Sequence, residues 1–149
     1  METVPYVDLE KYAGDWYEIA SFPQSFQKEC TCTKANYSAN EDGTITVINS
    51  CNLPEGKTKI STAKAFVEDG SGNAKLKVQF FWPLKGKYWI IDLAKDYSYA
   101  VVGHPNHNYL WILSRTPEID DTLYEKLLEG IAEKGFDIGK LEKTIQSEC

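Results

Sequence analysis

The strongest constraint on the fold of this chain is a long succession of short β-rich segments separated by turn residues. In the run 75–80, Leu76, Val78 and Phe80 alternate with two lysines and a glutamine, which is typical of a strand with one apolar face. We expect further strands over residues 14–22, 33–39, 44–49, 57–67, 88–93, 99–102 and 109–113. Asp42-Gly43 supplies the positive φ of a tight hairpin turn. About eight short strands with short links predict a barrel or sandwich.

The C-terminal part has a different periodicity. Thr116-Pro117 breaks the last strand, and Asp120 or Asp121 can cap a helix. Apolar residues then recur at helical spacing before Gly135, which suits a left-handed C-terminal residue. We therefore expect one amphipathic helix of about four turns on the outside of the barrel, with residues 141–149 running back along it. The apolar residues at helical spacing are Leu123, Leu127, Leu128 and Ile131.

Length and charge exclude several classes of protein. The 149 residues suit one domain spanning 1–149, and 42% hydrophobic residues with 13% aromatics exclude disorder. The formal net charge of −6 disfavours nucleic acid as a partner and, on average, anionic membrane surfaces. No stretch is apolar enough to span a bilayer, and we expect no signal peptide at the start of this chain.

Four cysteines, Cys30, Cys32, Cys51 and Cys149, point to two disulfides. A Cys-x-Cys pair is too tight for the usual zinc spacing, and buried free thiols are the remaining alternative. The spacing alone leaves three pairings open. Two disulfides imply an oxidising compartment.

Three motifs occur in order along the chain. They are GDWYEIA at 14–20, DYSYA at 96–100 and YLWILSRTP at 109–117. With the helix that follows, they resemble the lipocalin family, including its bacterial outer-membrane, plant and apolipoprotein D-like members; Lys95 departs from the threonine common in the family. The resemblance implies an eight-stranded antiparallel up-and-down barrel with one C-terminal helix outside. In it Trp16 plugs the floor, Arg115 stacks on the indole, and Gly14 permits close approach of the chain.

The interior of such a barrel can hold one small ligand if its inward side chains leave room. Ser61, Ala63 and Ala65 are small and share one face. The resemblance implies that Tyr37, Asn49 and Trp111 line the pocket, and ordinary core packing is the alternative for each residue of the wall. Further candidates for the wall are Ala63, Ala65, Leu76, Val78 and Phe80.

The resemblance also implies the disulfides Cys32–Cys149 and Cys30–Cys51. Because Cys30 and Cys32 are close neighbours, the exchanged pairing of Cys32 with Cys51 and Cys30 with Cys149 stays open. The implied location is the periplasm, the outer membrane, the extracellular space or an organelle lumen.

The implied function is binding and transport or storage of a small hydrophobic ligand, such as a fatty acid or lysophospholipid. The alternatives are a lipid-modifying enzyme of isomerase or de-epoxidase type, with Cys51 as its one candidate thiol, and a partner-binding domain with a filled core. We expect no cofactor and no metal; His104 and His107 read as exposed loop histidines, and no catalytic motif occurs. We expect a monomer or weak homodimer, with peripheral membrane association left open.

Overall fold

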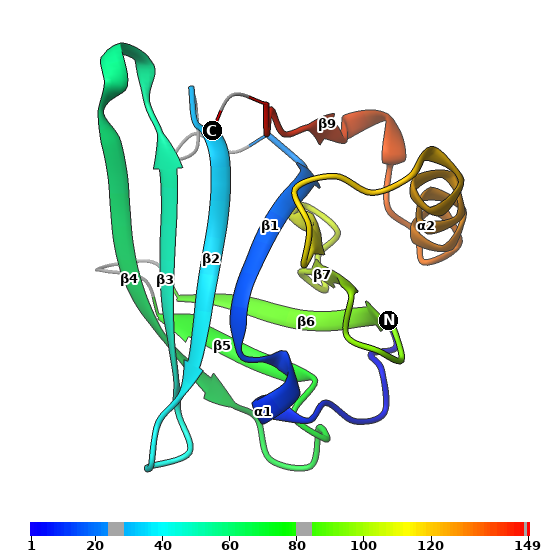
Figure 1. Ribbon diagram of the computed structural model, residues 1–149. Coiled ribbons are helices and arrows are strands. Elements are labelled where there is room, and N and C mark those ends of the chain that lie inside the picture. Colours follow the sequence, from blue (N-terminus) through cyan, green and yellow to red (C-terminus); the bar gives the residue numbers. More distant parts are fainter. Residues whose placement is uncertain (24–28, 80–84, 148) are drawn as a thin grey trace.

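The computed structural model describes residues 1–23, 29–79, 85–147 and 149. Each strand pairs antiparallel with the next along the chain, and β8 and β2 both pair with β1, so the sheet closes on itself (Figure 1). The eight-stranded up-and-down barrel expected from the sequence is thus confirmed. Its strands are β1 (Gly14–Ser21), β2 (Thr31–Ala39), β3 (Ile45–Asn52), β4 (Thr58–Val67), β5 (Lys75–Gln79), β6 (Lys85–Leu93), β7 (Tyr99–Gly103) and β8 (Leu110–Ser114).

The β2–β3 hairpin shows how local sequence sets the register. Gly43 adopts φ +86°, and its N–H donates to the Asn40 carbonyl at 3.1 Å. The Asp42 carboxylate accepts from the Thr44 N–H at 3.0 Å, which ties the turn together. The turn therefore lies where the Asp-Gly pair predicted it.

β3 is longer than expected, because it continues past Asn49 to Asn52. Ser50 lies opposite Ile60 and Asn52 opposite Thr58, so β4 supplies hydrogen-bonding partners for these polar residues. A 3₁₀ turn, η2 (Pro54–Gly56), then joins β3 to β4. Cross-strand pairing thus decided the boundary, which composition alone did not reveal.

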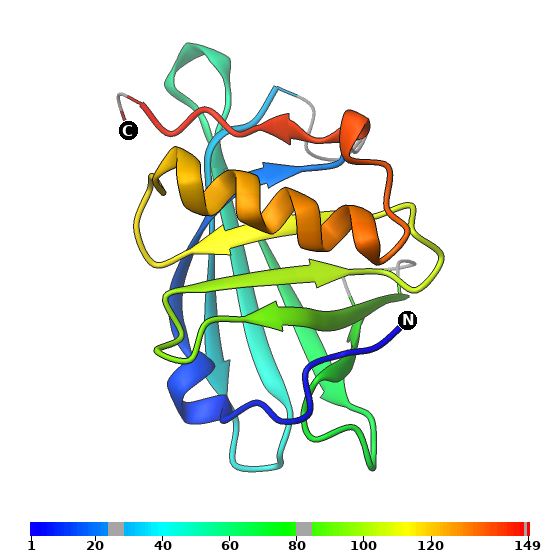
Figure 2. The same ribbon diagram turned by 90° about the vertical axis from the view of Figure 1, so that its right-hand side faces the viewer.

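Two apolar layers follow from the alternation along the strands. One fills the barrel interior, and the other lies between the barrel wall and α2 (Asp121–Glu133), which crosses the outer surface (Figure 2). Asp120 caps α2 by accepting from the Leu123 N–H at 2.7 Å, and Gly135 follows with φ +95°. The helix and its position outside the barrel are as expected, and Leu127 and Ile131 are its buried residues.

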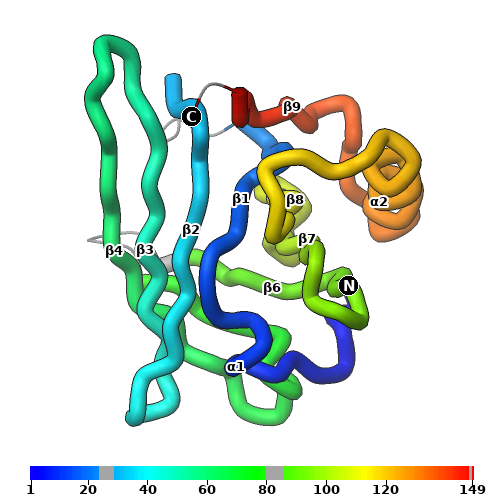
Figure 3. Tube along the Cα trace, viewed as in Figure 1, coloured from blue at the N-terminus to red at the C-terminus, as the bar shows by residue number. Residues whose placement is uncertain are grey.

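The chain ends run along opposite ends of the barrel. Near the N-terminus, α1 (Leu9–Tyr12) is capped by Asp8 and precedes β1. After α2, the chain passes through η3 (Ile138–Lys140) and β9 (Glu142–Lys143), which pairs with β1 (Figure 3). The tail then reaches β2, where the Cys32 N–H donates to the Ile145 carbonyl at 2.7 Å.

Candidate ligand-binding site

The floor of the barrel is built around Trp16, which is fully buried. Its Nε1–H donates to the Tyr12 carbonyl at 2.8 Å, and the Arg115 guanidinium carbon lies 3.7 Å from the centroid of its ring system. That distance is a cation–π contact, which contributes about 0.5–2 kcal/mol. The indole therefore closes the α1 end of the barrel.

Arg115 is fixed by three backbone carbonyls as well as by the indole. Its Nε donates to Tyr97 at 3.1 Å, Nη1 to Asp15 at 2.9 Å and Nη2 to Lys11 at 2.7 Å. Gly14 has φ +103°, and a Cβ there would lie 3.4 Å from Nη1. The guanidinium thus joins three chain segments across the closed end, and its role is structural.

Side chains of neighbouring strands meet in rows across the interior. Tyr37 lies opposite Val47, which lies opposite Ala63. One row nearer to α1, Ile45 lies opposite Ala65, which lies opposite Val78. Large residues on β2 and β3 therefore face alanines on β4, and the small side chains leave space between the walls.

A cavity lies in the half of the barrel nearer α1. Its empty space is about 260 Å³, part of it open to solvent. Of the expected wall residues, it brings together Tyr37, Ala65, Leu76 and Val78, whereas Phe80 lies outside the described residues. Five further residues line it that the sequence analysis did not single out: Leu9, Tyr12, Ile45, Tyr88 and Ile90. Tyr88 and Ile90 share one face of β6, so strand alternation could have found these two.

Asn49, Ala63 and Trp111 face the same interior but do not line this cavity. Ala63 is buried in the row next to it, and Asn49 lies one row further from α1, opposite Ala35 and Ser61. Trp111 is partly buried and stacks on Tyr109, with ring centroids 6.2 Å apart. The expected wall residues therefore occupy different levels of the barrel.

Three tyrosines form a hydrogen-bonded chain on the cavity wall. The Tyr12 and Tyr88 hydroxyl oxygens are 2.6 Å apart, and Tyr88 donates to Tyr37 at 2.8 Å. Desolvation by burial raises the pKa of Tyr37 to about 12, and it raises the pKa values of Tyr12 and Tyr88 well above the ordinary value. All three phenols therefore stay protonated at neutral pH.

A count of hydroxyl protons shows that the three tyrosines have one hydrogen-bond donor to spare. Three hydroxyl groups carry three protons, and two hydrogen bonds join them, so one proton is left over. Within the described residues, that proton has no acceptor. Because Tyr88 donates to Tyr37, the spare donor is the Tyr37 hydroxyl, on the cavity wall.

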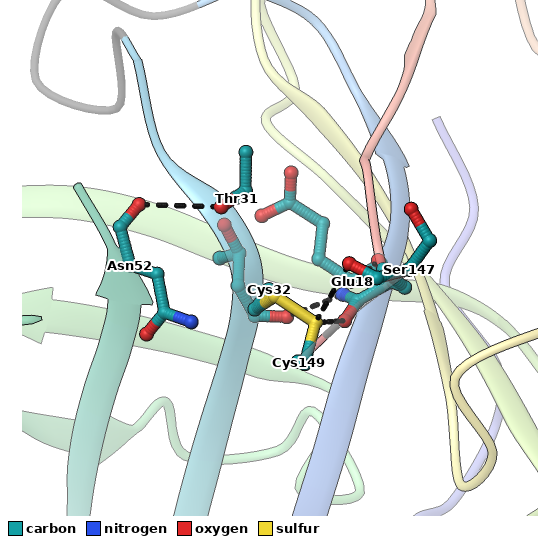
Figure 4. The surroundings of a disulfide bond; sticks show 8 residues. Glu18, Thr31, Cys32, Asn52, Ser147 and Cys149 are labelled. Atoms are coloured by element: carbon teal, nitrogen blue, oxygen red, sulfur yellow. Dashed lines mark hydrogen bonds between the residues drawn. A yellow bond between two sulfur atoms is a disulfide. The ribbon is translucent and has the colours of Figure 1, made fainter. Parts of the chain in front are cut away.

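The C-terminal tail is attached to β2 at the other end of the barrel. The structure joins Cys32 to Cys149 and Cys30 to Cys51, so the exchanged pairing is not formed. Figure 4 shows the Cys32–Cys149 bond with Glu18 beside it. Thr144 donates to the buried Glu18 carboxylate at 2.8 Å, and Gln146 donates to the Glu18 and Thr33 carbonyls. The tail thereby satisfies buried polar groups of β1 and β2.

The two histidines differ from expectation, because both are partly buried rather than exposed. The His107 ring packs on Phe136, with centroids 4.6 Å apart, and its Nε2 lies 3.0 Å from the Lys134 carbonyl at the end of α2. His104 accepts from the Asn106 N–H at 3.0 Å. Both act in loop packing, and the described residues hold no group of side chains suited to a metal ion.

A closed antiparallel barrel with an apolar interior and an indole floor defines the β-barrel proteins that bind small hydrophobic molecules. Comparison with known families places the chain within that class: a lipocalin-like domain matches residues 7–146. The chain belongs to the lipocalin family.

Several characterised proteins are similar over most of their length. Temperature-induced lipocalin-1 of Arabidopsis thaliana is 43% identical, with 99% of this chain and 84% of that protein covered. The outer membrane lipoprotein Blc of Vibrio cholerae is 40% identical (90% and 80% covered), and mouse apolipoprotein D is 38% identical (95% and 78% covered). The solved structure of insecticyanin from the tobacco hornworm Manduca sexta, 21% identical, superposes with a TM-score of 0.80 over 99% of this chain and 85% of that one.

Two observations bear on the cellular setting. No helix in the described ranges has the length and apolar character needed to cross a membrane. The two disulfides fit an oxidising compartment.

Proposed function

We propose that this lipocalin carries a single-chain lipid, such as a fatty acid or lysophospholipid, inside the barrel. The observation that carries the proposal is the small, partly open apolar cavity with one spare phenol proton on its wall. Its apolar lining shields the hydrocarbon of a bound ligand from water, which favours binding by about 25 cal/mol per Å² of buried apolar area. The entropy lost when ligand and side chains become ordered reduces this gain. The Tyr37 proton supplies a hydrogen bond to an acceptor atom of the ligand.

The size of the cavity favours a slender ligand. Pockets for drug-sized molecules are about 300–1,000 Å³, and the side chains around this cavity leave far less free room than that. An alkyl chain can adapt to a narrow space between Tyr37, Ala65 and Val78, whereas a rigid polycyclic molecule needs the walls to move apart. A carboxylate, ester carbonyl or hydroxyl on the chain would accept the spare proton.

Binding is better supported than catalysis on the same barrel. The thiol version of the enzyme alternative needs a free Cys51, and Cys51 is bonded to Cys30. All four cysteines are in disulfides. Titration of the native protein with a thiol reagent should find no reactive thiol, and a stoichiometric thiol would favour the enzyme. The disulfides support a location in the periplasm, at the outer membrane, outside the cell or in an organelle lumen.

Native mass spectrometry of the purified protein tests the proposal directly. We expect a co-purifying lipid, or uptake of added dodecanoate or lysophosphatidylcholine with a change in tryptophan fluorescence. Ala65→Leu should weaken this uptake at least tenfold, because the added carbons occupy the cavity. Thr62→Leu, on the outward face of the same strand, is the matched control and should bind as the wild type does.

Two results would overturn the proposal. One is an empty protein that responds to none of these lipids. The other is a folded Ala65→Leu variant with unchanged affinity, because the lipid would then lie elsewhere.

A further inference from the structure

The charge of this protein is unevenly distributed along the chain. Residues 57–87 contain seven lysines and two acidic residues, whereas the rest of the chain contains nine basic and twenty acidic residues. The stretch 57–87 includes β4, β5 and the start of β6. A chain with a net charge of −6 therefore carries a local excess of positive charge on adjacent strands.

The strand register gathers several of these lysines on the outer face of the barrel. Lys77 lies directly opposite Lys87 on β6 and Phe66 on β4. Lys64 and Lys75 lie two residues from these positions on β4 and β5, and they face the same way. Residues two apart on one strand are about 6.7 Å apart, and neighbouring strands are about 4.8 Å apart, so Lys77 is close to each of the other three lysines, while Lys64 and Lys75 are about 14 Å apart. We call Lys64, Lys75, Lys77 and Lys87 the lysine face.

Little in the described structure neutralises the lysine face. Lys64 is 3.7 Å from the Asp42 carboxylate and Lys77 is 3.8 Å from Glu68, which are long, exposed ion pairs. Lys87 has no carboxylate within ion-pair distance among the described residues. Like charges directly opposite each other in a sheet are destabilising, so the Lys77–Lys87 pair weakens the barrel unless an anion binds there.

Exposed apolar side chains lie on β3 and β4 beside the lysine face, and Ile60 lies about 13 Å further along β4 than Lys64. Ile60 is 66% exposed, Ile48 41% and Phe66 40%. All three point outward from β3 and β4, and Phe66 lies 5.7 Å from the Lys64 ammonium, measured to the ring centroid. Lysines interspersed with exposed isoleucine and phenylalanine suit a surface that is both anionic and partly apolar, as the headgroup region of a bilayer is.

We propose that the lysine face, with Ile48, Ile60 and Phe66, docks on a bilayer that contains anionic lipid. The acidic α2 does not oppose this contact, because it lies on the other side of the barrel from β4 (Figure 1). The Debye length at physiological ionic strength is about 8 Å, so charges across the barrel are screened. The local positive charge at the contact therefore decides the attraction to an anionic bilayer, rather than the net negative charge of the chain. This proposal is independent of the lipid carried in the cavity.

Flotation with lipid vesicles tests the docking surface. The wild type should bind vesicles of phosphatidylcholine with 30 mol% phosphatidylglycerol at low salt and should dissociate from them in 0.5 M NaCl. It should not bind vesicles of phosphatidylcholine alone. The variant Lys64→Gln/Lys77→Gln/Lys87→Gln should bind the anionic vesicles on the order of a hundredfold more weakly, since each lysine near such a surface contributes about fivefold. Ile60→Ser should weaken binding several-fold while leaving the salt dependence in place.

The matched control is Lys95→Gln/Lys126→Gln/Lys140→Gln, which changes the net charge equally at exposed lysines elsewhere. It should bind within about twofold of the wild type. Equal losses in both triple variants, or no vesicle binding by the wild type at low salt, would overturn the proposal. So would equally tight binding to transfer RNA, which would make the lysine face a general polyanion site. Dodecanoate uptake by the lysine-face variant should be unchanged, which separates docking from cavity binding.

Discussion

Replacing Trp16 with alanine tests the closed end of the barrel. The side chain is fully buried, donates to the Tyr12 carbonyl and stacks under Arg115. Loss of a buried tryptophan costs about 3–5 kcal/mol through lost transfer energy and the cavity left behind. The variant also leaves the Tyr12 carbonyl without its donor, while Arg115 keeps its three carbonyl partners. We therefore expect a loss of about 4 kcal/mol in the free energy of unfolding.

Circular dichroism measures this loss in guanidinium denaturation under oxidising conditions, and thermal melts of the same protein report it as a change in melting temperature. For a chain of this length, 1 kcal/mol corresponds to about 2–4 °C, so the melting temperature should fall by about 8–16 °C. Trp111→Ala is the matched control, because this indole is only partly buried, and its loss should cost about 1–2 kcal/mol. If Trp16→Ala melts within 3 °C of the wild type, the indole does not seal the floor and the reasoning is refuted.

Three further predictions concern the tyrosine chain and the disulfides. Tyr37→Phe should weaken dodecanoate binding by about fivefold in a fluorescence titration, since one hydrogen bond contributes about 1 kcal/mol. Binding of methyl dodecanoate, whose ester carbonyl also accepts a hydrogen bond, should weaken by a smaller factor, and unchanged affinity for both lipids would argue against a spare donor. Because the folded pKa of Tyr37 is raised from 10.0 to about 12, the unfolded chain loses this proton first. The contribution of Tyr37 to stability should be constant below pH 10 and fall as the pH rises from about 10 to 12, which denaturant melts at each pH would show and which a flat profile above pH 10 would contradict. Removing Cys32–Cys149 by double serine substitution should cost about 1.5 kcal/mol more than removing Cys30–Cys51, because the sequence separations are 117 and 21. Chemical denaturation compares the two variants, and the opposite order would point to effects in the folded state.

Most of the fold follows from local sequence signals. The alternation of Leu76 and Val78 with lysines predicted β5, and the Asp-Gly pair located the β2–β3 turn. The ends of strands do not follow from local composition, as the extension of β3 to Asn52 shows. Strand ends depend on whether a partner strand lies alongside, and local composition carries little information about that.

The candidate site was predicted only in part. Tyr37, Ala65, Leu76 and Val78 lie on the cavity wall, and period-two alternation assigns the last three to the inward face. Asn49 and Trp111 share that face but lie at another level, and alternation cannot rank residues by depth. Depth is set by the register between strands, including the irregularity between Glu18 and Ala20 that shifts the pairing of β1 with β8.

The sequence by itself determined the succession of strands, the helix and the family, because these depend on residues within a few positions of one another or on short motifs. Only the tertiary structure decided that Tyr12, Tyr37 and Tyr88 form one hydrogen-bonded chain, since these residues are 51 and 76 positions apart. It also decided that the lysines of β4, β5 and β6 share one surface. Both arrangements arise when a closed sheet fixes which residues stand opposite each other, and that choice is made by packing over the whole barrel.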